Sequence, residues 1–62
     1  MIVKIKNKSN REIPEELANA CNQSLSEINR IAEEYNLRVI EFEKEFDKNG
    51  NVSSQIITIA SV

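Results

Sequence analysis

Residues 37–62, LRVIEFEKEFDKNGNVSSQIITIASV, decide the fold, because they read as two strands joined by a tight turn. The dipeptide Asn49-Gly50 is the strongest short-range signal for a β-hairpin. Apolar and polar residues alternate on both sides of it, which predicts strands over Leu37–Asp47 and Val52–Val62. The C-terminal half of the chain is therefore expected to form an antiparallel hairpin.

The register of this hairpin follows from its turn. If Asn49 and Gly50 are the two turn residues, Ile40 pairs with Ile59 and Phe42 with Ile57 on one face, which is expected to meet a helix. A slip of one residue would mix apolar and polar faces, so the pairing supports this register. The opposite, open face then holds Val39, Glu41, Glu43 and Glu45 from the first strand and Ile56, Thr58 and Ala60 from the second.

A single amphipathic helix is expected before the hairpin, from Pro14 to Tyr35. Its apolar residues recur at steps of three and four: Leu17, Cys21, Leu25, Ile28, Ile31, Ala32 and Tyr35. Pro14 suits the first helical position, and Asn36 suits the left-handed residue that follows a helix. Ser24 falls within the apolar stripe, where its hydroxyl is expected to donate back to the carbonyl of Ala20.

The first residues, Met1–Lys6, alternate Val3 and Ile5 with lysines and predict a half-buried strand. One helix returns the chain to its starting end, so the first two strands run the same way and the third runs against both. An all-antiparallel sheet then has the order 1-3-2, and the uncharged stretch Val52–Val62 suits its centre. The expected fold is one α+β domain over 1–62, a β-α-β-β two-layer sandwich with a three-stranded antiparallel sheet and one helix on one face.

Composition limits what this chain can do. It has 62 residues, one cysteine and no histidine, which excludes an internal disulfide and argues against a zinc site. A core this small gains stability from oligomerisation, so a homo-oligomer is expected, with a dimer favoured. A net charge of −2 gives no general attraction to nucleic acid or anionic lipid. No apolar run approaches the ~20 residues that cross a bilayer, and no signal peptide opens the chain, so a cytoplasmic protein is expected.

No group is placed for catalysis. The general base most often used near neutral pH is histidine, which is absent. Cys21 lies in the apolar stripe and is interpreted as a small buried hydrophobe. Neither an enzyme nor a metal site is predicted.

Two charged clusters have a functional and a structural interpretation. The row Glu41, Glu43 and Glu45 could bind a cation or a basic partner, but the solvated face of an edge strand is favoured. The cluster Lys4, Lys6, Lys8 and Arg11 could contact phosphates, but protective charges at a sheet edge are favoured. The aromatic residues Tyr35, Phe42 and Phe46 are all expected in the core, which leaves no platform for stacking bases.

The order strand, helix, hairpin resembles that of the dodecins, small flavin-storing proteins whose subunits assemble into a hollow shell. The resemblance is carried by the hairpin, from Val39–Phe42 through the turn to Gln55–Thr58. It implies a small-ligand carrier with sites between subunits. The family's flavin stacks on a tryptophan at the start of the second strand, where this chain has Asn36 and Leu37, so no cofactor is expected.

The leading hypothesis is a non-enzymatic interaction protein that forms a homodimer or binds a larger protein through the open face of the sheet. The residues expected at this interface are Ile2, Val39, Glu41, Glu43, Ile56, Thr58 and Ala60. The alternative is a small-ligand carrier that forms a dodecin-like higher oligomer. A third hypothesis, a nucleic-acid accessory, would use the basic cluster near the N-terminus.

Overall fold

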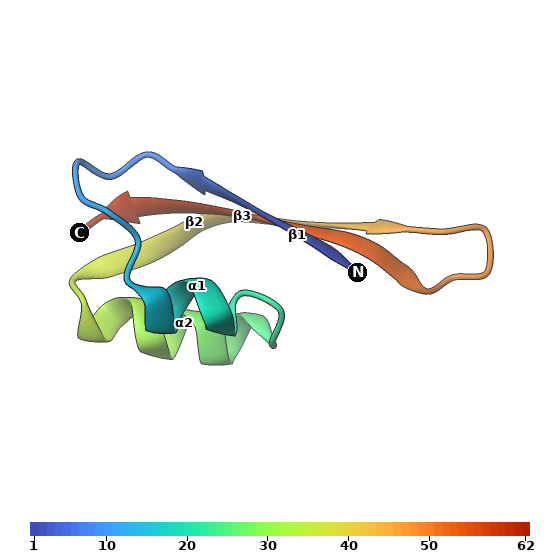
Figure 1. The fold of residues 1–62 in the computed structure, drawn as a ribbon, viewed down its shortest axis with the longest axis horizontal. Coiled ribbons are helices and arrows are strands. Elements are labelled where there is room, and N and C mark those ends of the chain that lie inside the picture. The colour runs from blue at the N-terminus through green and yellow to red at the C-terminus, as the bar shows by residue number, and fades with distance from the viewer.

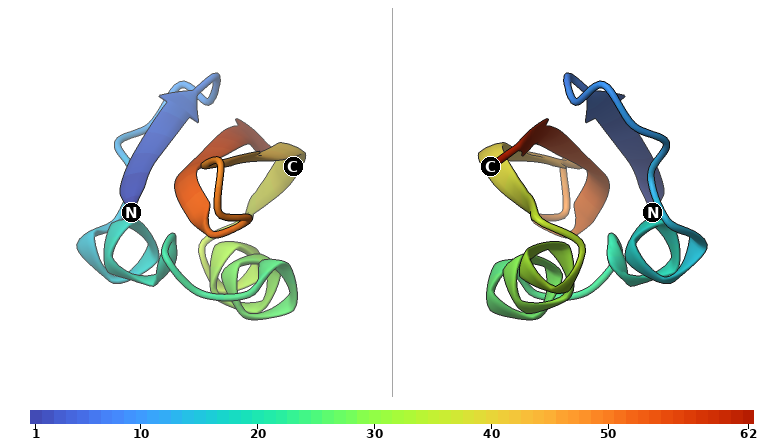
Figure 2. Two further views of the ribbon diagram at one scale, coloured as in Figure 1. Left: turned by 90° about the vertical axis from the view of Figure 1, so that its right-hand side faces the viewer. Right: turned by 90° about the vertical axis from the view of Figure 1, so that its left-hand side faces the viewer.

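The structure is a computed structural model that describes residues 1–62. Its elements are β1 (Ile2–Asn7), α1 (Glu15–Ala20), α2 (Leu25–Glu34), β2 (Leu37–Phe46) and β3 (Val52–Ser61). The strands form one sheet in the order β1-β3-β2, as predicted. Both helices lie on the same side of the sheet, side by side (Figures 1 and 2). Neither helix is long and apolar enough to cross a membrane.

The direction of the strands corrects the prediction. The sheet is mixed, because β1 is parallel to β3 while β2 is antiparallel to it. The reason is the number of helices between β1 and β2. Two helices that run in opposite directions reverse the chain once more than one helix does, so β2 runs against β1 (Figure 1). The expected all-antiparallel sheet with one helix is therefore wrong in these two respects.

The helix is broken at a capping site. The first helix ends at Ala20, and Ser24 precedes the second, in an extended conformation with φ −71° and ψ 156°. The Glu27 amide donates to the Ser24 hydroxyl at 3.4 Å, which satisfies one of the free N–H groups at the start of α2. Ser24 is thus an N-cap, not a residue inside a continuous helix. The predicted left-handed residue is confirmed at Asn36, which has φ 58°.

The core lies between the two helices and the sheet. Nine buried residues form it: Leu17, Ala20, Cys21, Ile28, Ile31, Ala32, Leu37, Ile57 and Ile59. One polar side chain, Gln55, joins the broken helix to β3. Its Nε2 donates to the carbonyl oxygens of Cys21 at 2.6 Å and Gln23 at 3.2 Å. Carbonyls freed by the helix break therefore find their partner on the central strand.

The hairpin register is confirmed in the middle and differs at both ends. Phe42 pairs with Ile57 and Glu43 with Ile56, as predicted. The connection is longer than two residues, because the Asp47 amide donates to the Asn51 carbonyl and Gly50 takes the left-handed conformation, with φ 83°. A β-bulge beside the turn, between the pairs Glu45–Ser54 and Phe46–Val52, restores the predicted register.

A second bulge lies at Ile40 and changes which face its neighbours occupy. The ladder passes from Glu41–Thr58 to Val39–Ile59, which leaves Ile40 as the extra residue. Val39 consequently packs against the core, whereas Ile40 is 42% exposed. The sequence placed these two side chains the other way round, because strict alternation cannot accommodate an inserted residue.

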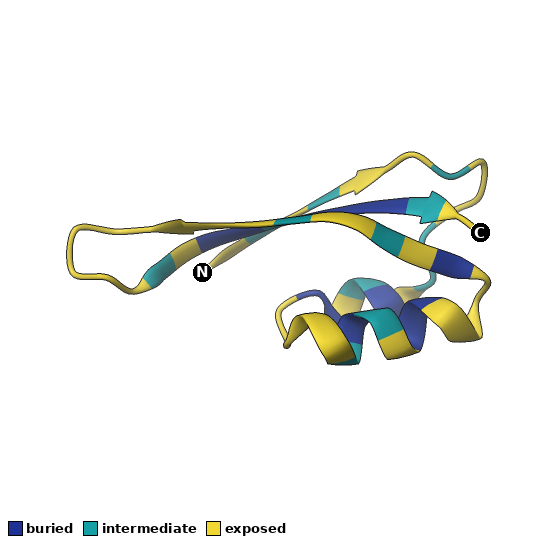
Figure 3. Cartoon of the chain, turned by 180° about the vertical axis from the view of Figure 1, so that it is seen from behind, coloured by how far each residue is buried: buried dark blue, intermediate teal, exposed yellow.

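The distal half of the hairpin projects beyond the helices and is exposed over most of its length (Figures 1 and 3). Phe46 lies there with 61% of its surface exposed, so it is not a core residue. Tyr35 is also at the surface, and its hydroxyl donates to the Glu16 carboxylate at 2.8 Å. Of the three aromatic residues, only Phe42 packs against the core as predicted.

Candidate functional site

The face of the sheet that points away from the helices, called the outer face below, is the candidate site. Successive side chains of a strand point to opposite faces. On β3 the residues Ile57 and Ile59 belong to the core, so Ile56, Thr58 and Ala60 point outward. Both helices lie on the other side of the sheet, and no element of the chain covers the outer face (Figures 1 and 2).

Opposite charges flank the middle of the outer face. Lys4 pairs with Ile56, which pairs on its other side with Glu43. The next row of side chains that point to the outer face consists of Lys6, Thr58 and Glu41. Neighbouring strands are about 4.8 Å apart, so a lysine column on β1 and a glutamate column on β2 stand roughly 10 Å from each other across β3. The predicted glutamate row and half of the predicted basic cluster are therefore brought to one surface.

The charged columns are not neutralised within the chain. The ion pairs of the structure join Arg30 to Glu27 and Glu34 on α2, and none involves Lys4, Lys6, Glu41 or Glu43. Two further charged residues, Glu45 and Arg38, lie on the outer face, one row before and one row after these four along the strands. Glu45 accepts a hydrogen bond from the Ser54 hydroxyl, and Arg38 pairs in the ladder with Ala60. The middle of the face thus carries two positive and two negative groups that lack an ionic partner.

The apolar residues of the outer face differ in exposure. Thr58, which is polar, is only 2% exposed. Ile56 and Ala60 are half-buried. Ile2, at 63%, and Ile40, at 42%, are the exposed apolar side chains of this face. Of the residues predicted for the open face, Val39 lies on the other face, since it packs toward the helices.

Sequence reasoning missed Ile40 as a residue of the outer face. A signal was present in the numbering of the apolar residues of β2. Leu37 and Val39 have odd numbers, whereas Phe42 and Phe46 have even numbers. Such a change of phase within one strand indicates an inserted residue, which is a bulge.

The basic cluster near the N-terminus is divided. Arg11 Nη2 donates to the carbonyl oxygen of Asn36 at 2.7 Å, so this guanidinium ties the loop after β1 to the end of α2. Lys4 and Lys6 instead lie on the outer face with β3. Arg11 therefore has a partner within the chain, whereas no ion pair involves Lys4 or Lys6.

Cys21 is confirmed as a buried residue. It is fully buried in the core, and its thiol donates to the carbonyl oxygen of Leu17 at 3.2 Å. Burial raises the pKa of the thiol above its ordinary value of 9.0, so the neutral form is favoured. A nucleophilic cysteine needs the opposite environment.

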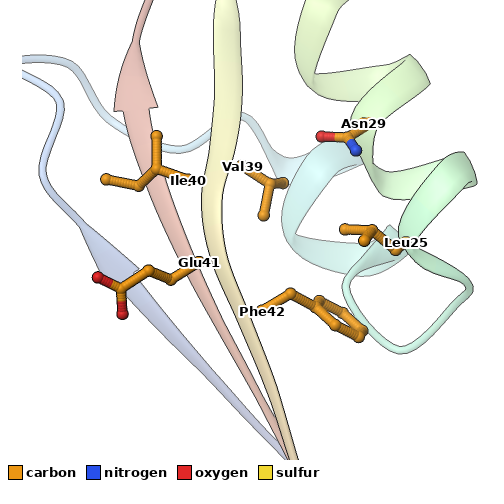
Figure 4. Close-up of a pocket in the computed structure, with 6 residues that line it drawn as sticks. All are labelled: Leu25, Asn29, Val39, Ile40, Glu41 and Phe42. Atoms are coloured by element: carbon orange, nitrogen blue, oxygen red, sulfur yellow. The ribbon is translucent and has the colours of Figure 1, made fainter.

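A shallow pocket of about 180 Å³ lies beside β2, lined by Leu25, Asn29, Val39, Ile40, Glu41 and Phe42. Val39 and Phe42 point toward α2, whereas Ile40 and Glu41 lie on the other side of the strand (Figure 4). The pocket therefore lies at the edge of the sheet, beside the bulge, and is lined by residues from both faces of β2. Its volume is below the roughly 300–1,000 Å³ of small-molecule sites.

Comparison with known proteins gives no match: no family model, no curated sequence and no solved structure is significantly similar to this chain.

Proposed function

We propose that this protein is a non-enzymatic interaction module that acts by forming a homodimer through the outer face of its sheet. The observation that carries the proposal is the composition of this uncovered face. Half-buried Ile56 lies in its middle beside the buried Thr58, with lysines on one side and glutamates on the other. An apolar centre within a charged rim is the usual anatomy of a protein–protein interface.

The size of the core supports the same conclusion. Only 12 of the 62 residues are buried, so the helix-covered side of the sheet supplies a small hydrophobic core. Chains of this length commonly gain stability from an additional partner surface. Covering the outer face would remove Ile2 and Ile40, both exposed, from water.

The test is the native mass of an Ile56→Glu variant, measured by light scattering. Because Ile56 points away from the core, the variant should keep its circular dichroism spectrum while a buried, like-charged pair of glutamates opposes the dimer. The expected result is a fall from twice 7.1 kDa to 7.1 kDa.

Leu25→Glu is the matched control. It places the same charge on a partly exposed apolar residue, on the opposite side of the sheet and in the first turn of α2, where a carboxylate is tolerated well. This variant should remain a dimer. A dimer that survives Ile56→Glu, or one that Leu25→Glu disrupts, would place the interface elsewhere. A larger protein in place of the second copy would leave the wild type at 7.1 kDa and contradict the homodimer.

A further inference from the structure

We propose that the second copy docks face to face about a two-fold axis parallel to β3, so that the lysine column of each copy lies over the glutamate column of the other. This inference rests on the proposed function, in which the outer face is the interface. It adds the symmetry of the dimer and the residues that specify it.

The symmetry follows from the layout of the face. A half-turn about an axis parallel to the strands exchanges the two sides of the sheet and leaves the position along the strand unchanged. Lys4 and Glu43 flank the same residue of β3, and so do Lys6 and Glu41. Lys4 would therefore lie opposite the partner's Glu43, and Lys6 opposite the partner's Glu41.

One other two-fold axis in the plane of the face keeps the strands of the two stacked sheets aligned, and it runs across the strands. It would lay β1 over the partner's β1, so that Lys4 and Lys6 faced lysines and the glutamates faced glutamates. Like charges brought together at an interface weaken association and oppose that arrangement. Charge complementarity thus selects one of the two axes.

About the chosen axis, β3 of one copy lies directly over β3 of the other copy. Ile56 and Ala60 point outward along the central strand, and each would face its own copy across the interface. Stacked sheets are about 10 Å apart, so identical side chains on the central strands meet in the middle. Glu45 and Arg38 lie in the rows outside the two charged ones, and Glu45 is already bonded to Ser54.

Charge reversal tests this pairing. Variant one carries Lys4→Glu and Lys6→Glu, and variant two carries Glu41→Lys and Glu43→Lys. Each variant alone replaces the attraction between opposed columns by repulsion, so its dimer dissociation constant should rise by at least about tenfold. An equimolar mixture should form a heterodimer with an affinity near that of the wild type, because the columns are complementary again. Circular dichroism checks that both variants are folded.

The outcome separates the two proposals. If the wild type is a dimer that Ile56→Glu disrupts, but either charge variant alone dimerises as tightly as the wild type, the outer face is the interface and the proposed axis is wrong. If the mixture fails to associate, the column pairing is wrong. If the wild type is a monomer, the proposed function itself fails.

A cross-linking experiment distinguishes the axes without changing a charge. Ile56→Cys and Ala60→Cys are treated separately with a short bis-maleimide of about 10 Å reach, the spacing of stacked sheets. Both variants should be linked to themselves, because every outward residue of β3 faces its own copy about the proposed axis. Linking at only one position indicates the perpendicular axis and would overturn the proposal. The wild type is the blank, since its one cysteine, Cys21, is fully buried.

Discussion

The two faces of β3 differ in how much of their environment the chain itself provides. Ile57 and Ile59 are completely buried by residues of the two helices and of β2. Ile56 and Ala60, on the same strand, are only half-buried and lie among charged side chains. One uncharged central strand therefore contributes fully buried residues to the core on one side and half-buried residues to the surface on the other. Period-2 alternation along a single strand thus places core residues and surface residues next to each other in the sequence.

The largest expected effect is on the helix-covered side. Ile57→Ala should lower the free energy of unfolding by about 2–5 kcal/mol, because it leaves a cavity in a core that has no solvent access. Ile56→Ala, one residue away on the half-buried face, should cost the isolated subunit less. Urea denaturation at matched low protein concentration measures both values. Equal losses would contradict the division between the two faces.

The break between the helices should have a smaller effect. Ser24→Ala removes the acceptor of the Glu27 amide and should lower the free energy of unfolding by about 1 kcal/mol. Ser24→Asp keeps an acceptor and should retain most of the stability. Ser26→Ala is the control for loss of a hydroxyl in the same turn. The Ser26 hydroxyl lies 3.3 Å from that of Ser24 but accepts from no amide of α2, so this variant should lose less stability than Ser24→Ala. Thermal denaturation followed by circular dichroism compares the three variants.

The smallest effect concerns pH and the buried thiol of Cys21. Its pKa in the folded chain is raised by burial above the ordinary value of 9.0. Below that value the thiol is neutral in both the folded and the unfolded chain, so its contribution to the free energy of unfolding is fully present and does not change with pH. Above pH 9.0 the unfolded chain ionises first, so this contribution to stability is lost as the pH rises toward the folded-state pKa. Urea denaturation across this range should show the decline in the wild type.

Cys21→Ala is the control for the pH series, since it removes the titrating group. The decline above pH 9.0 should be shallower in this variant, although its stability at neutral pH is lower because of the missing sulfur. An identical pH profile in both proteins would show that burial does not raise the pKa of the thiol in the folded chain.

Local signals in the sequence predicted the elements that depend on neighbouring residues. Asn36 is left-handed and Gly50 lies in the hairpin turn, because these positions require residues that tolerate positive φ. The pairing of Phe42 with Ile57 followed from matching apolar faces across the hairpin. The order 1-3-2 was predicted from an all-antiparallel sheet together with the uncharged third strand. The order is confirmed, although the direction of β1 is not.

The main error had one local cause with a distant consequence. Ser24 and Glu27 have the spacing of a capping box, but the apolar stripe continues through them and favoured a single helix. Because the cap was missed, the predicted chain reversed direction once less often between β1 and β2. The predicted direction of β1 relative to β3 was consequently wrong. Periodicity shows which residues are apolar on one side, but it does not show whether a helix continues or restarts.

The error at the candidate site was of the same kind. The bulge at Ile40 exchanges the faces of Val39 and Ile40, and the hairpin pattern was treated as uninterrupted. The glutamates of the outer face were placed correctly because they lie between the two bulges of the hairpin, where alternation holds. Glu41 and Glu43 are on this face for that reason.

The most direct test of the account is the mass of the wild-type protein at sedimentation equilibrium, from low micromolar to near-millimolar concentration. We predict a reversible equilibrium that approaches twice 7.1 kDa at the upper end, as expected if the proposed second copy covers the outer face. A mass of 7.1 kDa throughout this range would show that the face remains open, and would contradict the central claim.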